Sequence, residues 1–209
     1  MAASSPLYWQ RARRALARSD PTLADIIRAC RGVALCGRGD PFQTLARSIV
    51  GQQISVKAAA SVWGRLVEAV GGTTVPDAVA NTPTQVLRRA GLSQRKAEYV
   101  RELAQHFVDG RLQPARWQMM NDEAVIDELT EVRGVGRWTA EMFLIFNLMR
   151  PDVLPVADVG LQRAISLHYR GGRVVSERTL RRIAAPWSPW RSVATWYLWR
   201  SLEPVPVEY

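Results

Sequence analysis

Asp158 is the residue of this sequence best placed to do chemistry. It follows the proline-marked loop 151–157 and directly precedes a stretch of helical apolar spacing that we expect to form a helix over 159–169. An aspartate in this position caps the helix, and the backbone N–H groups and helix dipole favour its ionised form. An ionised carboxylate could stabilise a developing positive charge and orient or deprotonate water. The alternative reading is an ordinary helix cap, and the two roles are compatible.

A short glycine turn precedes this loop. The Gly134-Val135-Gly136 turn separates two segments of helical spacing, so residues 122–149 are predicted to form a helix, a tight turn and a second helix. Without a Cβ, glycine permits positive φ and close approach to another surface. The N–H groups at the start of the second helix would then point outward and could bind an anion. Taken alone, a Gly-x-Gly turn is also typical of a plain helix-to-helix connection.

The motifs around these two features resemble those of the helix-hairpin-helix DNA glycosylases of the endonuclease III superfamily, and most closely the DNA-3-methyladenine glycosylase II family. The resemblance is carried by GVGRWTA at 134–140, LPVAD at 154–158, WSPWRS at 187–192 and GQQIS at 51–55. Together these motifs span about residues 40 to 202. The resemblance implies base excision repair, in which the N-glycosidic bond of a flipped, alkylated base such as 3-methyladenine or 7-methylguanine is hydrolysed in duplex DNA, leaving an abasic site.

Within this resemblance Asp158 is the catalytic residue, because the sugar develops oxocarbenium character as the base departs. A base alkylated at a ring nitrogen is already cationic and leaves as a neutral molecule, so one carboxylate is enough. The bifunctional members of the superfamily carry a nucleophilic lysine in the hairpin, and the matching position here is Trp138. The resemblance therefore implies a monofunctional enzyme without lyase activity.

The resemblance also assigns the residues that receive the base. Trp138 and Trp199 would form the aromatic walls of the pocket, although core packing is the alternative for most of the eight tryptophans. Met142 lies one turn after Trp138 on the same helix face, where relatives often carry tyrosine, and Ala157 stands where relatives are often acidic. Both departures predict a more open site, which would select the bases it releases by how readily they leave and not by tight hydrogen bonding.

The expected DNA contacts lie in the hairpin and in the upstream GQQIS motif. Gln53 would plug the gap left by the flipped nucleotide, where relatives often have an apolar side chain; the alternative is solvated polar sequence at a helix junction. No cofactor is expected, except that hairpin carbonyls could hold a monovalent cation when DNA is bound. By resemblance, the DNA-binding residues are Gly134, Val135, Gly136, Arg137, Thr139, Gln52 and Gln53.

The composition suits a polyanionic partner. The chain of 209 residues has a net charge of +9, and phosphate neutralisation dominates non-specific affinity for nucleic acids. Since Lys57 and Lys96 are the only lysines among 28 basic residues, the excess of arginine could also reflect codon usage. We expect double-stranded DNA containing alkylated bases as the partner, and a monomer in the bacterial cytoplasm at the nucleoid.

Several other classes are disfavoured. Cys30 and Cys36 are too few for a disulfide framework, a cysteine zinc site or a cysteine-ligated iron–sulfur cluster. His106 and His168 are too sparse for a zinc-hydrolase motif. No apolar run reaches membrane-spanning length, and residues 1–19 lack an apolar signal core. We therefore expect neither a metal centre, nor membrane association, nor secretion.

The fold is predicted to be all-α. Proline after a capping residue marks helix starts at Asp20, Asp40, Thr82 and Ser188. Further caps are expected at Ser55, Ser93, Asn121 or Asp122, and Ser176, with helix ends near Gly71, Gly91 and Gly110. With about ten helices, the resemblance implies two lobes, one of about 1–35 plus 150–209 and the other of about 40–149, with the substrate cleft between them.

Two other functions remain open at this stage. One is a helix-hairpin-helix module that only grips the DNA backbone, which would need neither Asp158 nor the aromatic C-terminus. The other is a glycosylase for uracil or mismatched bases, whose neutral leaving groups would demand more polar, base-reading contacts than the sequence reveals.

Overall fold

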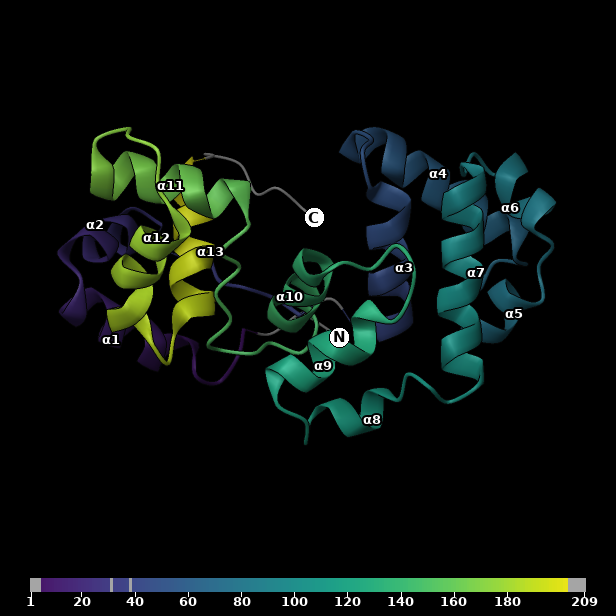
Figure 1. Ribbon diagram of the computed structural model, residues 1–209, viewed down its shortest axis with the longest axis horizontal. Helices are drawn as coiled ribbons and strands as arrows, with labels where there is room; N and C mark the ends of the chain where they lie inside the picture. The colour runs from purple at the N-terminus through teal and green to yellow at the C-terminus, as the bar shows by residue number, and fades with distance from the viewer. Residues whose placement is uncertain (1–4, 31, 38, 203–209) are drawn as a thin grey trace. The chain divides into compact units, whose positions relative to one another are not determined.

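The computed structural model describes residues 5–30, 32–37 and 39–202. In this part of the chain the secondary structure consists of thirteen α-helices and one short 3-10 helix, without a strand (Figure 1). The predicted all-α class is confirmed. Residues 1–4 and 203–209, which we assigned to the first lobe, lie outside the described residues.

The described helices group into two compact units. Of the described residues, 5–30, 32–37 and 144–202 form one unit and 39–143 form the other. From the sequence we placed the second boundary at about residue 150. The division between the two units falls inside α10 (Arg137–Phe146), so this helix contributes residues to both units.

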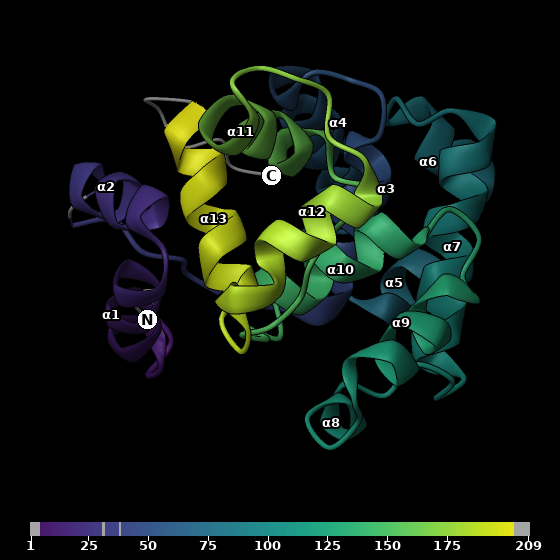
Figure 2. The same ribbon diagram turned by 60° about the vertical axis from the view of Figure 1, so that its left-hand side comes forward.

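The first unit is built around its last helix. Its helices are α1 (Trp9–Ser19), α2 (Pro21–Ala29), α11 (Val159–Arg170), α12 (Glu177–Ala184), η1 (Ala185–Trp187) and α13 (Arg191–Leu202). Helix α13 packs against α1, α2 and α11, as can be followed in Figure 2. Every residue from Ser192 to Trp199 is buried, because a helix that is apolar all round must be covered on every side.

Asp20 joins the beginning and the end of this unit. Its Oδ1 accepts the Leu23 N–H at 3.1 Å, which caps α2. Its Oδ2 accepts the Tyr169 hydroxyl and the Trp187 Nε1–H, each at 2.8 Å. Burial, together with the hydrogen bond and negative charge of Asp20, raises the pKa of Tyr169. The first helices of the chain are thereby held against the last ones.

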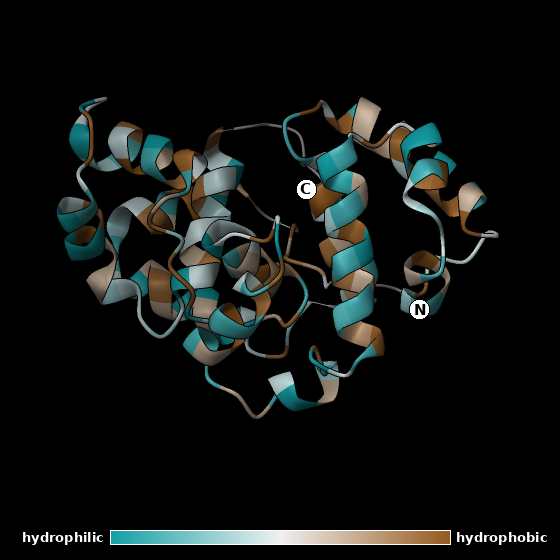
Figure 3. Ribbon diagram, turned by 45° about the vertical axis from the view of Figure 1, so that its right-hand side comes forward, coloured by the Kyte–Doolittle hydropathy of each residue, from teal (hydrophilic) through white to brown (hydrophobic). Residues whose placement is uncertain are grey.

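The second unit is organised around α7 (Gln94–Val108), which packs against α3 (Pro41–Gly51), α5 (Pro76–Ala80) and α6 (Thr84–Arg89). Most helices carry a hydrophobic and a hydrophilic face (Figure 3). An aromatic chain runs through the core, with consecutive ring centroids 5.2 to 6.1 Å apart, formed by Phe42, Phe107, Trp117 and Phe143. The remaining helices are α4 (Val56–Ala69), α8 (Pro114–Trp117), α9 (Asp122–Thr130) and the first part of α10.

Most of the predicted helix boundaries are confirmed. Each of six expected caps accepts a hydrogen bond from the backbone N–H three residues later; these are Asp20, Asp40, Ser55, Ser93, Asn121 and Ser176. The expected stop glycines follow their helices with positive φ, namely Gly71, Gly91 and Gly110. Local capping chemistry therefore sets most of the helix ends.

Two predicted caps are wrong. Helix α6 begins at Thr84, and the Thr82 hydroxyl instead donates to the Ala78 carbonyl at 2.7 Å, at the end of α5. Ser188 precedes a cis proline, and α13 begins only at Arg191. The Ser188 hydroxyl donates to Asp152 Oδ2 at 2.8 Å. In both cases the hydroxyl that we expected to accept a backbone N–H as a cap donates instead to an oxygen atom outside the expected helix.

Candidate active site and nucleic-acid interface

Asp158 lies at the N-cap of α11, as predicted. Its Oδ1 accepts the Leu161 backbone N–H at 2.6 Å and the Trp199 Nε1–H at 2.7 Å. The residue is only 8% exposed. The carboxylate is thus held by two donors on the same oxygen, one from its own helix and one from α13. An ordinary surface cap would need only the first.

Trp199 is in turn fixed by its surroundings. Its ring stacks on Phe146, with centroids 5.7 Å apart and an interplanar angle of 14°. Gly160 lies beside it, and a Cβ there would be 3.1 Å from both Asp158 Oδ1 and Trp199 Cδ1. The glycine leaves room for the indole to reach the carboxylate. Sequence reasoning missed both Phe146 and Gly160, although a glycine in the first turn of a helix is unfavourable enough to signal such a close approach.

The loop before Asp158 is anchored to the start of α13. Arg191 Nε and Nη2 bind the two oxygens of Asp152 at 2.7 and 2.8 Å. The Val153 N–H donates to the Ser192 hydroxyl at 2.8 Å, and the Ser192 N–H donates to the Pro151 carbonyl at 3.0 Å. Burial acts to raise the pKa of Asp152, but hydrogen bonds from Arg191 and Ser188 and the Arg191 charge lower it below its ordinary value. This part of the WSPWRS motif therefore fixes the loop that leads to the carboxylate.

The glycine turn has one constrained glycine, not two. Gly134 has a φ of 89°, and a Cβ there would clash with the ring of Tyr99. Gly136 does not take a positive φ, and a Cβ there would meet no atom within 4 Å. Val135 is buried at 4% exposure. Gly134 is thus required by the protein itself, whereas Gly136 presents open backbone at the start of α10.

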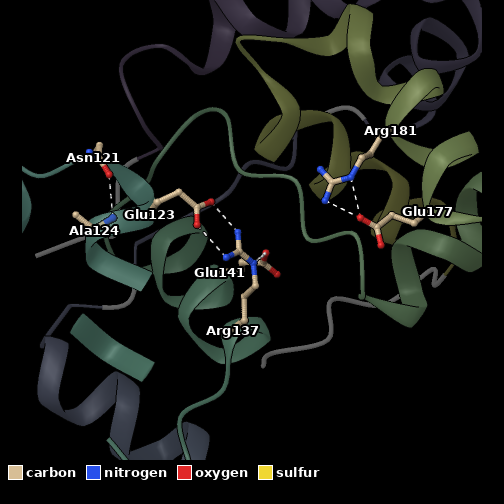
Figure 4. A network of polar contacts seen from close by, with 7 residues as sticks. All are labelled: Asn121, Glu123, Ala124, Arg137, Glu141, Glu177 and Arg181. Atoms are coloured by element: carbon tan, nitrogen blue, oxygen red, sulfur yellow. Dashed lines mark hydrogen bonds and ion pairs between the residues drawn. The ribbon is translucent and has the colours of Figure 1, made fainter. Parts of the chain in front are cut away.

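Arg137 and Thr139 are less available to DNA than we expected. The Arg137 guanidinium binds both oxygens of Glu123 at 2.7 and 2.9 Å and Glu141 Oε1 at 3.1 Å (Figure 4). The hydrogen bonds to Glu123 contribute most to the raised pKa of Arg137. Thr139 is 6% exposed. A DNA contact through the Arg137 side chain would therefore compete with the two glutamates.

The GQQIS motif is bonded directly to the hairpin. The Gln52 side-chain amide donates to the Gly134 carbonyl at 2.7 Å. Gln53 is exposed and has a φ of 59°, a conformation that few residues other than glycine adopt. Lys96 Nζ donates to the Val50 and Gln52 carbonyls at 2.8 and 2.6 Å. Sequence reasoning missed Lys96, whose only signal was the rarity of lysine in this chain.

The structure therefore brings together Asp158 with Trp199, and Gln52 with Gly134. Trp138 and Met142 belong to the part of α10 that lies in the second unit. Trp138 is 40% exposed, whereas Met142 is buried at 8% exposure. Their assignment to a base-binding pocket stays a prediction.

The described residues contain no group of three or more His, Cys, Asp or Glu side chains that could hold a metal ion. Within the same ranges, none of the helices combines the length and the apolar character needed to cross a membrane.

Comparison with known proteins gives consistent matches. The family model described as HhH-GPD superfamily base excision DNA repair protein matches residues 46–189. The chain is 31% identical over 192 residues to a putative DNA-3-methyladenine glycosylase, YfjP, of Bacillus subtilis, covering 88% of this chain and 67% of that protein. The chain spans about two thirds of the length of the curated relatives it matches.

Solved structures agree. A crystal structure of DNA-3-methyladenine glycosidase from Bacillus halodurans has a TM-score of 0.84 and 38% identity, covering 91% of this chain and 88% of that one. The 3-methyladenine DNA glycosylase Mag1 of Schizosaccharomyces pombe, in complex with abasic DNA, has a TM-score of 0.79 and 25% identity, covering 91% of this chain and 96% of that one.

Proposed function

Because the chain belongs to the HhH-GPD superfamily of base excision DNA repair proteins, we propose that it hydrolyses the N-glycosidic bond of alkylated bases in duplex DNA. The observation that carries this proposal is the buried Asp158 carboxylate held by the Trp199 indole. A module that only binds DNA would need neither. The relatives named as 3-methyladenine glycosylases, and Mag1 bound to abasic DNA, support both the substrate class and the product.

The reaction follows from the charge of the substrate. When the bond from C1′ to the glycosidic ring nitrogen of the base breaks, its electron pair stays on the base, which is cationic because another ring nitrogen is alkylated, and the base leaves as a neutral molecule. The sugar becomes an oxocarbenium ion, which the Asp158 carboxylate stabilises electrostatically. Water then adds to C1′ and loses a proton, which Asp158 accepts and passes to solvent. The products are the free base and an abasic site.

The base pocket is proposed to include Trp138, Met142 and Trp199. Aromatic faces attract a cationic base and offset the unstacking of the flipped nucleotide. The single N–H of the Trp199 indole is used by Asp158, so this ring can offer its π-surface but no hydrogen bond that reads the base. Selection in this pocket then rests on base charge and leaving-group lability, which favours 3-methyladenine and 7-methylguanine over uracil.

The chain carries no lysine suited to lyase chemistry in the part that the structure describes. The hairpin position occupied by lysine in bifunctional relatives is Trp138. Lys96 is engaged with two backbone carbonyls, and Lys57 is exposed on α4. We therefore propose a monofunctional glycosylase that leaves the DNA backbone intact.

Duplex DNA is proposed to bind at the hairpin through backbone groups. The start of α10 supplies N–H donors, and the open space at Gly136 lets a phosphate approach closely. A monovalent cation on the hairpin carbonyls when DNA is bound stays part of the proposal, with the Gly134 carbonyl already accepting from Gln52. We expect the protein to act as a monomer on the nucleoid in the cytoplasm.

The test is release of methylated bases from alkylated duplex DNA, measured by chromatography for the wild type and for Asp158→Asn. Asparagine keeps a cap oxygen for the Leu161 N–H but removes the negative charge. We expect base release to be lost while duplex binding stays within about threefold, since the carboxylate acts on the transition state. Asp25→Asn, which alters an exposed carboxylate on α2, should behave as wild type. Full activity of Asp158→Asn would refute the assignment.

A further inference from the structure

Helix α7 presents three side chains, spaced three residues apart, to the two segments that we propose contact DNA. Lys96 binds the last turn of α3 through the Val50 carbonyl and the loop between α3 and α4 through the Gln52 carbonyl. The Tyr99 ring lies against the backbone of Gly134 in the hairpin turn. Glu102 accepts hydrogen bonds from the backbone N–H and the guanidinium of Arg133. Residues at this spacing follow one inclined row of a helix, so a single rigid element holds both segments.

The loop is held at its most constrained point. Gln53 takes a φ of 59°, and a residue other than glycine keeps such a conformation only where its surroundings impose it. The carbonyl that Lys96 binds at 2.6 Å belongs to the peptide group joining Gln52 to Gln53. The orientation of this peptide sets the φ of Gln53. By binding the Gln52 carbonyl, Lys96 therefore opposes a rotation of this peptide group, which would change the φ of Gln53 and move its side chain.

The interaction of Lys96 with this site is favourable on other grounds. The Val50 carbonyl belongs to the last turn of α3, where backbone oxygens lack intrahelical partners and a cation is favoured. Partial burial lowers the pKa of Lys96, but two carbonyl acceptors at 2.6 and 2.8 Å fit the ammonium form with its three donors. The Gln52 side chain then links the same loop to the Gly134 carbonyl.

We propose that Lys96 is a positioning residue for base flipping, because it holds Gln53 in the conformation in which it fills the gap left by the flipped nucleotide. The inference rests on the proposed function and on the role of Gln53 as the plug. The loop is set before DNA binds, so no ordering cost is incurred when the nucleotide leaves the stack. Loss of Lys96 should then impair extrusion of the base and leave the bond-breaking step intact.

The experiment compares Lys96→Met with Lys57→Met, which removes the other lysine, exposed on α4, and changes the net charge equally. Single-turnover base release is measured on two duplexes, one with the alkylated base paired and one with it opposite an abasic analogue. An unpaired base is easier to extrude. For Lys96→Met we expect release from the paired duplex to fall about tenfold, as for loss of a charged hydrogen bond. Release by Lys96→Met from the duplex with the unpaired base should differ from wild type by less than about twofold. Release by Lys57→Met should stay within the same limit on both duplexes.

A double-mutant cycle separates positioning from general damage. Gln53→Ala should lower release from the paired duplex on its own, and adding Lys96→Met to it should cause no further loss, because both changes remove the same plug. Additive effects, or equal losses on both duplexes, would overturn the inference. If Gln53→Ala released the paired base at the wild-type rate, the inference would be overturned even if Lys96→Met failed to fold. A wild-type protein that releases no base from either duplex would instead refute the proposed function.

Discussion

Gly160→Ala tests whether the contact between Trp199 and Asp158 governs activity. The substitution adds one methyl group in the first turn of α11, 3.1 Å from Asp158 Oδ1 and 3.1 Å from Trp199 Cδ1. Neither neighbour can yield freely, since the carboxylate is held by the Leu161 N–H and the indole is stacked on Phe146. We expect the methyl group to displace the two side chains by a few tenths of an ångström and to weaken their hydrogen bond.

The magnitude follows from two opposing effects. Replacing glycine by alanine in a helix contributes about 0.5–1 kcal/mol of stability, whereas overpacking a buried site costs about 1–3 kcal/mol. The net destabilisation is then between about 0 and 2.5 kcal/mol, which lowers the Tm of a chain of this length by up to roughly 10 °C. Weakening a hydrogen bond to a charged group costs up to about 1.5–3 kcal/mol. If the transition state depends on that bond, base release falls by about tenfold or more.

Gly64→Ala is the matched control, because Gly64 lies within α4 and a Cβ there would meet no atom within 4 Å. It should raise the Tm slightly and leave base release unchanged. Both variants are measured by thermal unfolding and by single-turnover release from alkylated duplex DNA. If Gly160→Ala raises the Tm as Gly64→Ala does and keeps wild-type release, the close packing around Asp158 has no part in the reaction and the reasoning is wrong.

Three further predictions follow from the same structure. Gly136→Ala should weaken binding to all duplexes alike without lowering the Tm, whereas Gly134→Ala should lower the Tm because of its φ and the Tyr99 ring; a lesion-specific effect at Gly136 would contradict the backbone clamp. Met142→Tyr should change the relative rates over a lesion panel, and an unchanged profile would exclude Met142 from the pocket. The lowered pKa of Asp152 means that its contribution to stability is present above the unfolded pKa of about 4 and is lost as pH falls through the lower folded value. Asp152→Asn should therefore have a lower free energy of unfolding than wild type at pH 7, measured by denaturant titration. The difference between the two proteins should narrow as the pH is lowered, and a difference that stays constant would count against a stabilising pair of Asp152 with Arg191.

The family and the all-α class were predicted from the sequence, and both predictions are confirmed. They could be made because both depend on local sequence patterns. A capping side chain reaches an N–H only three residues away, so the pattern and the contact lie in the same segment. Asp158 was found in this way, as the cap of α11. The same reasoning failed at Thr82 and Ser188, whose hydroxyls cap no helix and donate to the Ala78 carbonyl and to Asp152 Oδ2. The partner of Ser188 lies 36 positions away, and a local pattern cannot show a contact at such a separation.

What the sequence left hidden is the set of contacts that hold each proposed functional residue in place. Trp199 reaches Asp158 from 41 positions away, and Lys96 reaches Gln52 from 44 positions away. Pairs at such separation leave no periodicity, and each residue alone is compatible with a plain structural role. Gly160 gives a partial signal, because a glycine in a helix costs stability relative to alanine wherever it stands. Gly64 also lies in a helix, yet a Cβ there would meet no atom within 4 Å, whereas a Cβ at Gly160 would lie 3.1 Å from both Asp158 Oδ1 and Trp199 Cδ1. A helix glycine therefore points to the packing behind the carboxylate only because it lies two positions after a residue that the sequence had already singled out.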